Sequence, residues 1–252
     1  MRYALISDIH ANLPALEAVL DDIGPQSIDA IYHLGDLVGY APWPNEVVQR
    51  LIDDGIPGIA GNYDSTVATD YKHCGCRYED PIQEALSHLS YAWTRENVTA
   101  ETKAWLGALP FRIDLRPMGG HIAGPTLTLV HGNQTLNTVY VTDDRSDDFL
   151  SKMGASIGAR AGDVVAFGHT HKPWHRLVEH VHFVNTGSVG RPKDGDPRAG
   201  YVILEFNGPE PTVEFRRVAY DVERAASGVF SSTLPREFAE YLRTGGTLAV
   251  TA

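Results

Sequence analysis

The stretch Tyr-Ala-Leu-Ile-Ser-Asp-Ile-His-Ala-Asn, residues 3–12, joins a short apolar run to a polar segment that follows it directly. Apolar side chains stand at both parities in this run, which is typical of a strand covered on both faces. From Leu13 to Ile23, apolar residues recur at helical spacing, and Pro14 suits the first turn of a helix. The order of strand, polar loop and helix predicts a layered α/β fold.

The same order recurs further along the chain. Residues 30–34 predict a second strand, with a polar loop at 35–40 and a helix around 47–52. Residues 58–60 predict a third strand, which is followed by Gly61-Asn62-Tyr63-Asp64. Later strands are expected at 112–115, 127–130, 164–167, 182–185, 201–204 and 213–216, and a further helix at about 147–160.

The 252 residues are expected to form a single domain, because α/β folds of this length commonly have one core. Residues 65–108 interrupt the strand pattern and predict a helical insertion around a looser stretch at 70–82. From about residue 221 the chain predicts a helical C-terminal tail. The apolar residues of this tail fit either packing on a sheet or a contact between copies of the chain, so a homo-oligomer is one expectation.

The formal net charge of −11 narrows the classes of partner. It argues against a surface for long nucleic acids or anionic membranes, which need clustered Lys and Arg. No apolar run approaches the roughly 18 residues of a membrane span, and no secretory signal is recognisable, so we expect a cytoplasmic protein. The two cysteines, Cys74 and Cys76, are expected to be free thiols in a reducing compartment.

Polar clusters follow five of the predicted strands. They contain Asp8 and His10, Asp36, Asn62, His131, and finally His169 and His171. Ligands of open α/β sheets bind just beyond the carboxyl ends of the strands, so these side chains can converge although they lie far apart in the sequence. Each cluster alone is common in turns. Their joint occurrence, each after a strand, indicates a functional site.

These residue types suit hard or borderline divalent metals. Carboxylate, amide oxygen and imidazole fit Mn, Fe, Zn, Co or Ni, whereas a soft ion prefers thiolate. Seven ligands exceed what one ion with open positions takes, but they suffice for two ions that share a carboxylate. Asp36 is the expected bridge, because the small neighbours Gly35 and Gly39 let both metals approach it.

At these motifs the sequence resembles the calcineurin-like metallophosphoesterase superfamily. The matching segments are Asp8-Ile9-His10, Gly35-Asp36-Leu37-Val38, Gly61-Asn62-Tyr63-Asp64, His131 and Gly168-His169-Thr170-His171, and the match covers roughly residues 1–206. Residues 7–12 and 185–192 look most like the bacterial and archaeal phosphodiesterase branch. The resemblance implies a four-layer αββα sandwich of two mixed β-sheets flanked by helices.

The resemblance also implies two divalent metal ions, with Mn first and Fe, Zn, Ni or Co as alternatives. It assigns Asp8, His10 and His171 to the first metal, Asn62, His131 and His169 to the second, and Asp36 to both. It places Asp36, Asn62, Tyr63 and His131 in catalysis. The implied reaction is in-line hydrolysis of a phosphate ester, most simply a phosphodiester, by a metal-bound hydroxide. An acidic chain can do this because the metals supply positive charge.

The chain departs from the family pattern at Tyr63, where many members have His. A tyrosine with a pKa near 10 can donate a hydrogen bond but is a poor proton donor at neutral pH. We therefore expect leaving groups that need little protonation, or another acid, for which His33, His73 and His175 are unranked candidates. Purple acid phosphatases place a metal-binding Tyr where this chain has Gly39, so an iron–tyrosinate site is not expected.

Other functions remain open at this point. A phosphomonoesterase, a protein phosphatase or a dinucleoside polyphosphate hydrolase would use the same metals, and a non-catalytic scaffold would use the same fold. In such scaffolds the ligands tend to be eroded, whereas all seven are present here. Arg191 and Arg198 are candidates for contacts with the phosphate of a small substrate, against the simpler reading that they form surface ion pairs.

Overall fold

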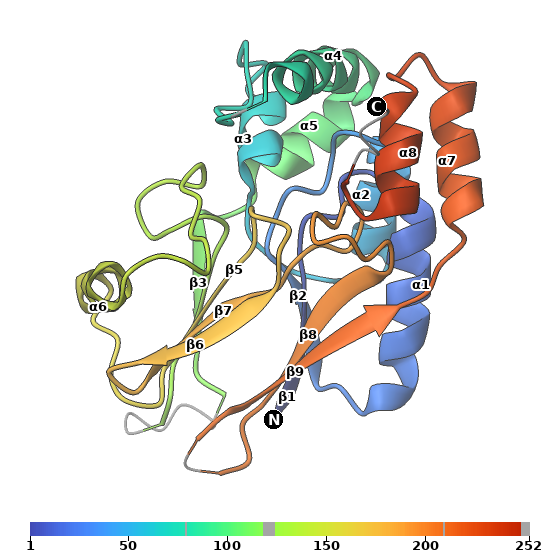
Figure 1. The fold of residues 1–252 in the computed structure, drawn as a ribbon. Helices are drawn as coiled ribbons and strands as arrows, with labels where there is room; N and C mark the ends of the chain where they lie inside the picture. Colours follow the sequence, from blue (N-terminus) through green and yellow to red (C-terminus); the bar gives the residue numbers. More distant parts are fainter. Residues whose placement is uncertain (79, 118–123, 209, 248–252) are drawn as a thin grey trace.

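Two mixed β-sheets lie at the centre of the computed structural model, which describes residues 1–78, 80–117, 124–208 and 210–247 (Figure 1). The four-stranded sheet has the order β2-β1-β8-β9, formed by β1 (Arg2–Ile6), β2 (Ala30–His33), β8 (Ala199–Glu205) and β9 (Thr212–Val218). The five-stranded sheet has the order β3-β4-β5-β7-β6, formed by β3 (Arg112–Leu115), β4 (Leu127–Val130), β5 (Val164–Phe167), β6 (Trp174–Val178) and β7 (Val181–Asn185). Parallel pairs join β1 to β2, β4 to β5, and β5 to β7.

Helices cover the outer faces of both sheets. On the side of the four-stranded sheet lie α1 (Leu13–Ile23), α2 (Pro44–Asp53), α7 (Val222–Ser231) and α8 (Glu237–Thr244), with the short 3-10 helix η1 (Gly24–Gln26) after α1. On the five-stranded sheet lies α6 (Asp147–Ser156). The helices α3 (Asn62–Ala68), α4 (Pro81–Asn97) and α5 (Ala100–Gly107) gather beyond one end of the sheets (Figure 1).

The buried apolar residues separate into three clusters that match this layering. One lies between the outer helices and the four-stranded sheet, and includes Leu16 and Ile203. A second fills the space between the sheets, with Leu5 and Leu129 among its members. A third joins the five-stranded sheet to α6 through Leu150 and its neighbours. The expected four-layer αββα sandwich is therefore confirmed.

Two strands differ from the sequence prediction. The expected strand at 58–60 makes one bridge, between Gly58 and His33, and does not extend a sheet. The strand does not continue, because the N–H of Ala60 donates to the carbonyl of Pro110 and not to a neighbouring strand. Conversely, β6 was not expected. It is an edge strand whose exposed side chains weaken the apolar pattern, and it pairs antiparallel with β7.

Apart from α3, which begins within the Gly-Asn-Tyr-Asp motif, the helices of the described residues lie near their expected places. Asn12 begins α1 by accepting a hydrogen bond from the N–H of Ala15 through its side chain, which leaves the preceding residues free to form a loop. The stretch expected to be a helical insertion contains α4 and α5, and the expected helical tail contains α7 and α8. No helix of the described chain is both long and apolar enough to cross a membrane.

Candidate metal centre

The sequence-predicted metal ligands come together at one end of the two sheets. Asp8 and His10 follow β1, and Asp36 follows β2, both in the four-stranded sheet. His131 follows β4, and His169 and His171 follow β5, both in the five-stranded sheet. Asn62 is instead the first residue of α3. The two layers of the sandwich thus contribute to one site.

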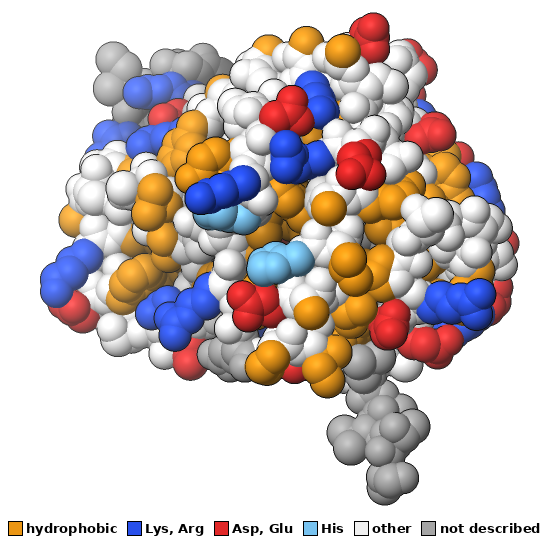
Figure 2. All heavy atoms as spheres, turned by 90° about the horizontal axis from the view of Figure 1, so that it is seen from above, with side chains coloured by type: hydrophobic (Ala, Val, Ile, Leu, Met, Phe, Trp, Pro, Cys, Tyr) orange, Lys and Arg blue, Asp and Glu red, His pale blue; other side chains and the backbone are white. Residues whose placement is uncertain are grey.

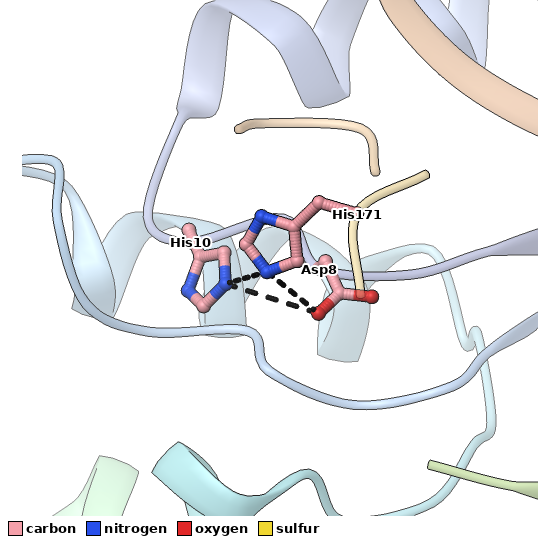
Figure 3. Close-up of side chains that lie close together, drawn as sticks. All are labelled: Asp8, His10 and His171. Atoms are coloured by element: carbon pink, nitrogen blue, oxygen red, sulfur yellow. Dashed lines mark hydrogen bonds and ion pairs between the residues drawn. The ribbon is translucent and has the colours of Figure 1, made fainter. Parts of the chain in front are cut away.

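Asp8, His10 and His171 form the first group (Figure 3). The Nε2 atoms of His10 and His171 are 3.0 Å apart, and Oδ1 of Asp8 is 3.2 Å from Nε2 of His171 and 3.8 Å from Nε2 of His10. A metal with ligand bonds of about 2.1 Å separates neighbouring ligand atoms by roughly 3.0–3.4 Å. The separations of 3.0 and 3.2 Å fit one shared cation, and the 3.8 Å separation is somewhat wider than this range.

Asp36, His131 and His169 form the second group, with one ligand atom from each within 4.8 Å of the others. Oδ2 of Asp36 lies 3.4 Å from Nε2 of His131. The same oxygen lies 3.8 Å from Nε2 of His10, which belongs to the first group. Asp36 is therefore placed between the two groups, as a carboxylate shared by two ions would be.

Hydrogen bonds on the far side of the imidazoles hold their orientation. Nδ1 of His10 lies 3.0 Å from the carbonyl oxygen of Val38, and Nδ1 of His131 lies 2.7 Å from that of Leu34. Nδ1 of His171 lies 2.6 Å from the carbonyl oxygen of Arg191. A carbonyl only accepts, so each Nδ1 carries a proton, and Nε2 of a neutral ring then presents a lone pair. This is the tautomer that a metal requires.

Four buried atoms of the predicted metal ligands have no hydrogen-bond partner among the described residues. They are Oδ1 of Asp8, Oδ1 of Asn62, Nε2 of His131 and Nε2 of His169. Buried polar atoms without a partner are costly and uncommon, so several in one place need an explanation. All four belong to predicted ligands, and a pair of cations would satisfy them. The donor set of carboxylate, amide and imidazole fits such ions.

The backbone of the site is unusual. Asp8, His10, Asp36, His169 and His171 all have φ between +49° and +67°, in the left-handed region. Residues other than glycine seldom adopt it, and such conformations concentrate at functional sites. This feature had no signal in the sequence.

Glycines in the motifs make room for neighbouring loops. A Cβ on Gly168 would collide with the side chains of Ser7 and Asp8, and one on Gly61 would collide with Asp36. Gly39, with φ +99°, lies against the ring of Tyr63. Gly35 and Gly39 were expected to give metals access to Asp36. The structure shows that the glycines also let protein segments approach each other closely.

Asp64 was not predicted as a functional residue, although it ends the Gly-Asn-Tyr-Asp motif. Its carboxylate is buried and accepts hydrogen bonds from the backbone N–H groups of Asp36, Leu37 and Gly61. These bonds tie the loop after β2 to the start of α3. Asp64 therefore positions Asp36 without facing the ligand groups itself. Burial, followed by the charge of Asp36, raises the pKa of Asp64 to about 7.

Burial controls the charge of the imidazoles. It lowers the pKa of His10 and of His169 to about 3, and that of His171 well below its ordinary value. These three rings are neutral, as ligands must be. Burial acts the same way on His131, but the carboxylate of Asp36 outweighs it and raises the pKa of His131 to about 10. That proton occupies the position of a cation and would leave when a metal binds.

Tyr63 lies beside the first group. Its ring is buried, 5.6 Å from the ring of His10 and 5.1 Å from that of Tyr40 between centroids. Burial raises the pKa of Tyr63 well above 10, so the phenol stays protonated and keeps a proton with which to donate a hydrogen bond. Tyr40, one residue after the position that is Tyr in purple acid phosphatases, also lines the cavity at the ligands.

The candidate replacement acids lie elsewhere. His33 is fully buried against Trp105, while His73 and His175 are exposed, and none of the three lines the cavity at the ligands. His175 instead stacks on His182. The structure gives these residues no access to a bound phosphate.

Two larger cavities each share one wall residue with the cavity at the ligands. The cavity at the ligands is small, about 10 Å³, and Tyr140 and Lys193 form parts of its wall. Tyr140 also lines a cavity of about 600 Å³ together with Arg77 and Arg145. Lys193 also lines a cavity of about 230 Å³ together with Lys172 and Arg191. Neither Tyr140 nor Lys193 stands in a recognisable motif, so neither could be predicted from the sequence.

The two predicted substrate arginines have different surroundings. Arg191 is 6% exposed and reaches a cavity beside His10. Arg198 is exposed and pairs with the carboxylate of Asp196, at 2.7 Å between Nη2 and Oδ2. The structure brings only Arg191 to the centre.

The cysteines correct one expectation. The structure joins Cys74 and Cys76 in a disulfide, with their Cα atoms 5.4 Å apart, so the prediction of free thiols is wrong. Gly75 between them has φ +74°, which folds the chain back tightly enough for the two side chains to meet. Cys76 also lines the cavity at the ligands, where its sulfur lies 3.2 Å from Nδ2 of Asn62.

The chain is similar to proteins of one family. Residues 1–208 match the family model of the calcineurin-like phosphoesterase superfamily domain. An uncharacterized protein of Methanocaldococcus jannaschii is 31% identical over 96% of this chain and 97% of its own length. The phosphodiesterase YfcE of Escherichia coli is 26% identical, with 81% of this chain and 88% of that protein covered.

A solved structure is similar over nearly the whole chain. The metallophosphoesterase from Sphaerobacter thermophilus superposes with a TM-score of 0.74 at 28% identity, covering 97% of this chain and 99% of that one. The fold, the paired groups of Asp and His and the family match point the same way. The chain belongs to the calcineurin-like phosphoesterase superfamily and is a hydrolase that acts on phosphate esters.

Proposed function

We propose that this hydrolase is a phosphodiesterase that works with two divalent metal ions, Mn²⁺ first among the candidates. Asp8, His10 and His171 would hold one ion and Asn62, His131 and His169 the other, with Asp36 between them. The observation that carries the proposal is the set of buried, unpartnered ligand atoms from Asp8, Asn62, His131 and His169. Bound ions of this kind supply an activated water and offset charge on the phosphoryl oxygens.

The residues of the chain position the substrate. Tyr63 donates a hydrogen bond to a phosphoryl oxygen, since its hydroxyl makes no hydrogen bond to the described residues and stays protonated. Tyr140 packs on His169, with ring centroids 4.1 Å apart, and so keeps water from one side of that ligand. No Ser or Cys nucleophile is required.

The cavities favour a diester over a monoester. A phosphodiester carries a substituent on each of two oxygens, and a monoester carries one. The cavity at the ligands adjoins a larger cavity through Tyr140 and another through Lys193. We assign the 600 Å³ cavity to the organic leaving group, because it is the larger of the two and has both polar and apolar walls.

The test is hydrolysis of bis-p-nitrophenyl phosphate and of p-nitrophenyl phosphate with Mn, Fe, Zn, Ni or Co added to the chelated protein. We expect metal-dependent cleavage and faster turnover of the diester. Asp36→Asn should reduce cleavage to the uncatalysed background and lower the bound metal. Asp22→Asn is the matched control, because Asp22 bonds Tyr201 far from the centre. A preference for the monoester, or full activity of Asp36→Asn, would refute the proposal.

A further inference from the structure

Three cationic side chains line one cavity next to the first ligand group. Lys172, Arg191 and Lys193 border a space of about 230 Å³, together with Gln83, Tyr241 and Gly246. No carboxylate is among these lining residues. The chain as a whole carries a net charge of −11, so three basic side chains with no acid among the described lining residues stand out. We name this space the cationic pocket.

The three cations form no ion pair with Asp or Glu in the described part of the chain. Arg and Lys residues elsewhere do so repeatedly, as Arg198 does with Asp196 and Lys152 with Asp148. On the face drawn in Figure 2, basic and acidic side chains also stand close to one another. Like charges held together repel, and an anion in the cationic pocket would relieve that repulsion.

Arg191 is a buried and firmly held cation of the cationic pocket. The residue is 6% exposed, and its Nε is buried without a hydrogen-bond partner among the described groups. Its guanidinium lies flat enough on Tyr40 to put Cζ 3.8 Å from the ring centroid, which holds the side chain in place. A buried guanidinium with an unused donor is suited to a phosphate.

The cationic pocket is tied to the metal ligands through His171. Lys172 follows His171 in the chain, and the carbonyl of Arg191 accepts the hydrogen bond from Nδ1 of His171 at 2.6 Å. The backbone N–H of Lys193 donates to the carbonyl of His171 at 3.3 Å. Lys193 lines both the cationic pocket and the cavity at the ligands. An anion held here would therefore be a neighbour of the group that reacts.

We propose that the cationic pocket binds a second phosphate group of the substrate, so that the preferred substrate is a phosphodiester carrying an additional phosphate. This inference rests on the proposed phosphodiesterase function. The second phosphate contacts Lys172, Arg191 and Lys193 and does not react. The scissile phosphate occupies the metal centre, and the leaving group lies on the side of Tyr140.

The test compares two dinucleotides that share the same scissile bond, the diadenylate ApA and its 5′-phosphorylated form pApA. Metal-loaded protein should cleave pApA with a kcat/KM at least about tenfold above that for ApA, since one charge-assisted contact is worth about this factor. In the double variant Lys172→Gln/Lys193→Gln, this ratio should fall toward one. Lys152→Gln, which removes the same charge at a remote exposed site, should keep the wild-type ratio. Arg191→Lys keeps the charge and serves if the double variant is unstable; it should lower the ratio in part.

Other outcomes are separable. A ratio near one in the wild type, or one unchanged in the double variant, overturns the inference while leaving the phosphodiesterase function intact. If neither dinucleotide is cleaved, the proposed function fails. Binding to the cationic pocket is then measured by calorimetric titration with pApA and ApA. Tighter binding of pApA that the double variant loses supports the pocket; equal binding overturns it. Tight binding of inorganic phosphate at these lysines with a ratio near one assigns the pocket to a free anion and overturns the substrate assignment.

Discussion

Nε2 of His10 and Nε2 of His171 lie 3.0 Å apart, although 161 positions separate the two residues in the chain. Both rings are neutral and both Nδ1 atoms donate to carbonyl oxygens, so two lone pairs face each other across this distance. Such an arrangement is unfavourable alone and favourable around a cation.

Ser7→Ala should weaken the first metal site without removing a ligand. Oγ of Ser7 donates to Oδ2 of Asp8 at 2.5 Å and leaves Oδ1 of Asp8 to face the histidines. Loss of such a supporting bond typically lowers metal affinity about 10–100-fold. Metal titration followed by elemental analysis measures the change. Ser151→Ala removes a hydrogen bond to Glu179 at a distant site and should leave the affinity unchanged.

Gly168→Ala should disrupt the first metal site, because the added methyl group has no space. The added methyl group would collide with Ser7 and Asp8, and both are fully buried. Forcing atoms into a filled interior costs roughly 1–3 kcal/mol, and here the displaced group is a ligand. We expect a lower midpoint of unfolding together with a lower metal content. Gly24→Ala, where a Cβ meets nothing within 4 Å, should change neither.

Tyr63→Phe should lower kcat with little effect on KM or on metal content. The ring packing on His10 and Tyr40 is kept, and only the hydrogen-bond donor is lost. One hydrogen bond to a developing charge corresponds to roughly tenfold in rate. Steady-state kinetics with bis-p-nitrophenyl phosphate decide the point. The control Tyr201→Phe loses a bond to Asp22 away from the cavity and should retain wild-type kinetics, whereas an unchanged kcat in Tyr63→Phe would contradict the assignment.

His33 should make stability depend on pH. Burial lowers its pKa in the folded protein to about 3, from about 6.5 when unfolded. Between these values the unfolded state binds the extra proton, so the free energy of unfolding decreases as the pH falls below about 6.5. From pH 7 to pH 5 this group contributes a loss of about 2 kcal/mol.

Chemical denaturation at pH 7 and pH 5 tests this, in the wild type, in His33→Gln and in the exposed control His88→Gln. The pH-dependent loss should be smaller in His33→Gln and unchanged in His88→Gln. Comparing each variant with itself at two pH values cancels any fixed cost of the substitution. An equal pH-dependent loss in all three proteins would assign the effect to other groups.

Much of the fold follows from local sequence, because buried strands such as β4 and β5 are short apolar runs that can be recognised without neighbours. The edge strand β6 could not be found in this way. Its hairpin turn places Glu179 and His180 at φ +48° and +62°, without the Asn-Gly signal that such turns usually show. The segment at 58–60 has the composition of a strand, but tertiary contacts leave it a single bridge.

The metal ligands could also be predicted from the sequence, because each ligand stands in a short motif beside a strand or helix. Residues that reach the centre from ordinary loops could not. Lys193 and Tyr140 become visible only when the loops are placed in space, and Asp64 acts through backbone N–H groups that carry no sequence signal. The Cys74–Cys76 pairing depends on a local turn geometry that spacing alone does not reveal.

The left-handed backbone at Asp8, His10, Asp36, His169 and His171 restricts which amino acids can occupy these positions at all. Glycine, asparagine, aspartate and histidine tolerate this conformation best, and the last three are also good oxygen or nitrogen donors. Substitution by alanine removes the donor atom. It also destabilises the folded protein by roughly 1 kcal/mol, because alanine disfavours the left-handed backbone conformation. An alanine knockout therefore mixes two effects. Asparagine is the better replacement for mutagenesis at these five sites, because it tolerates the backbone conformation. Natural variation at these sites should be confined to glycine, asparagine, aspartate and histidine.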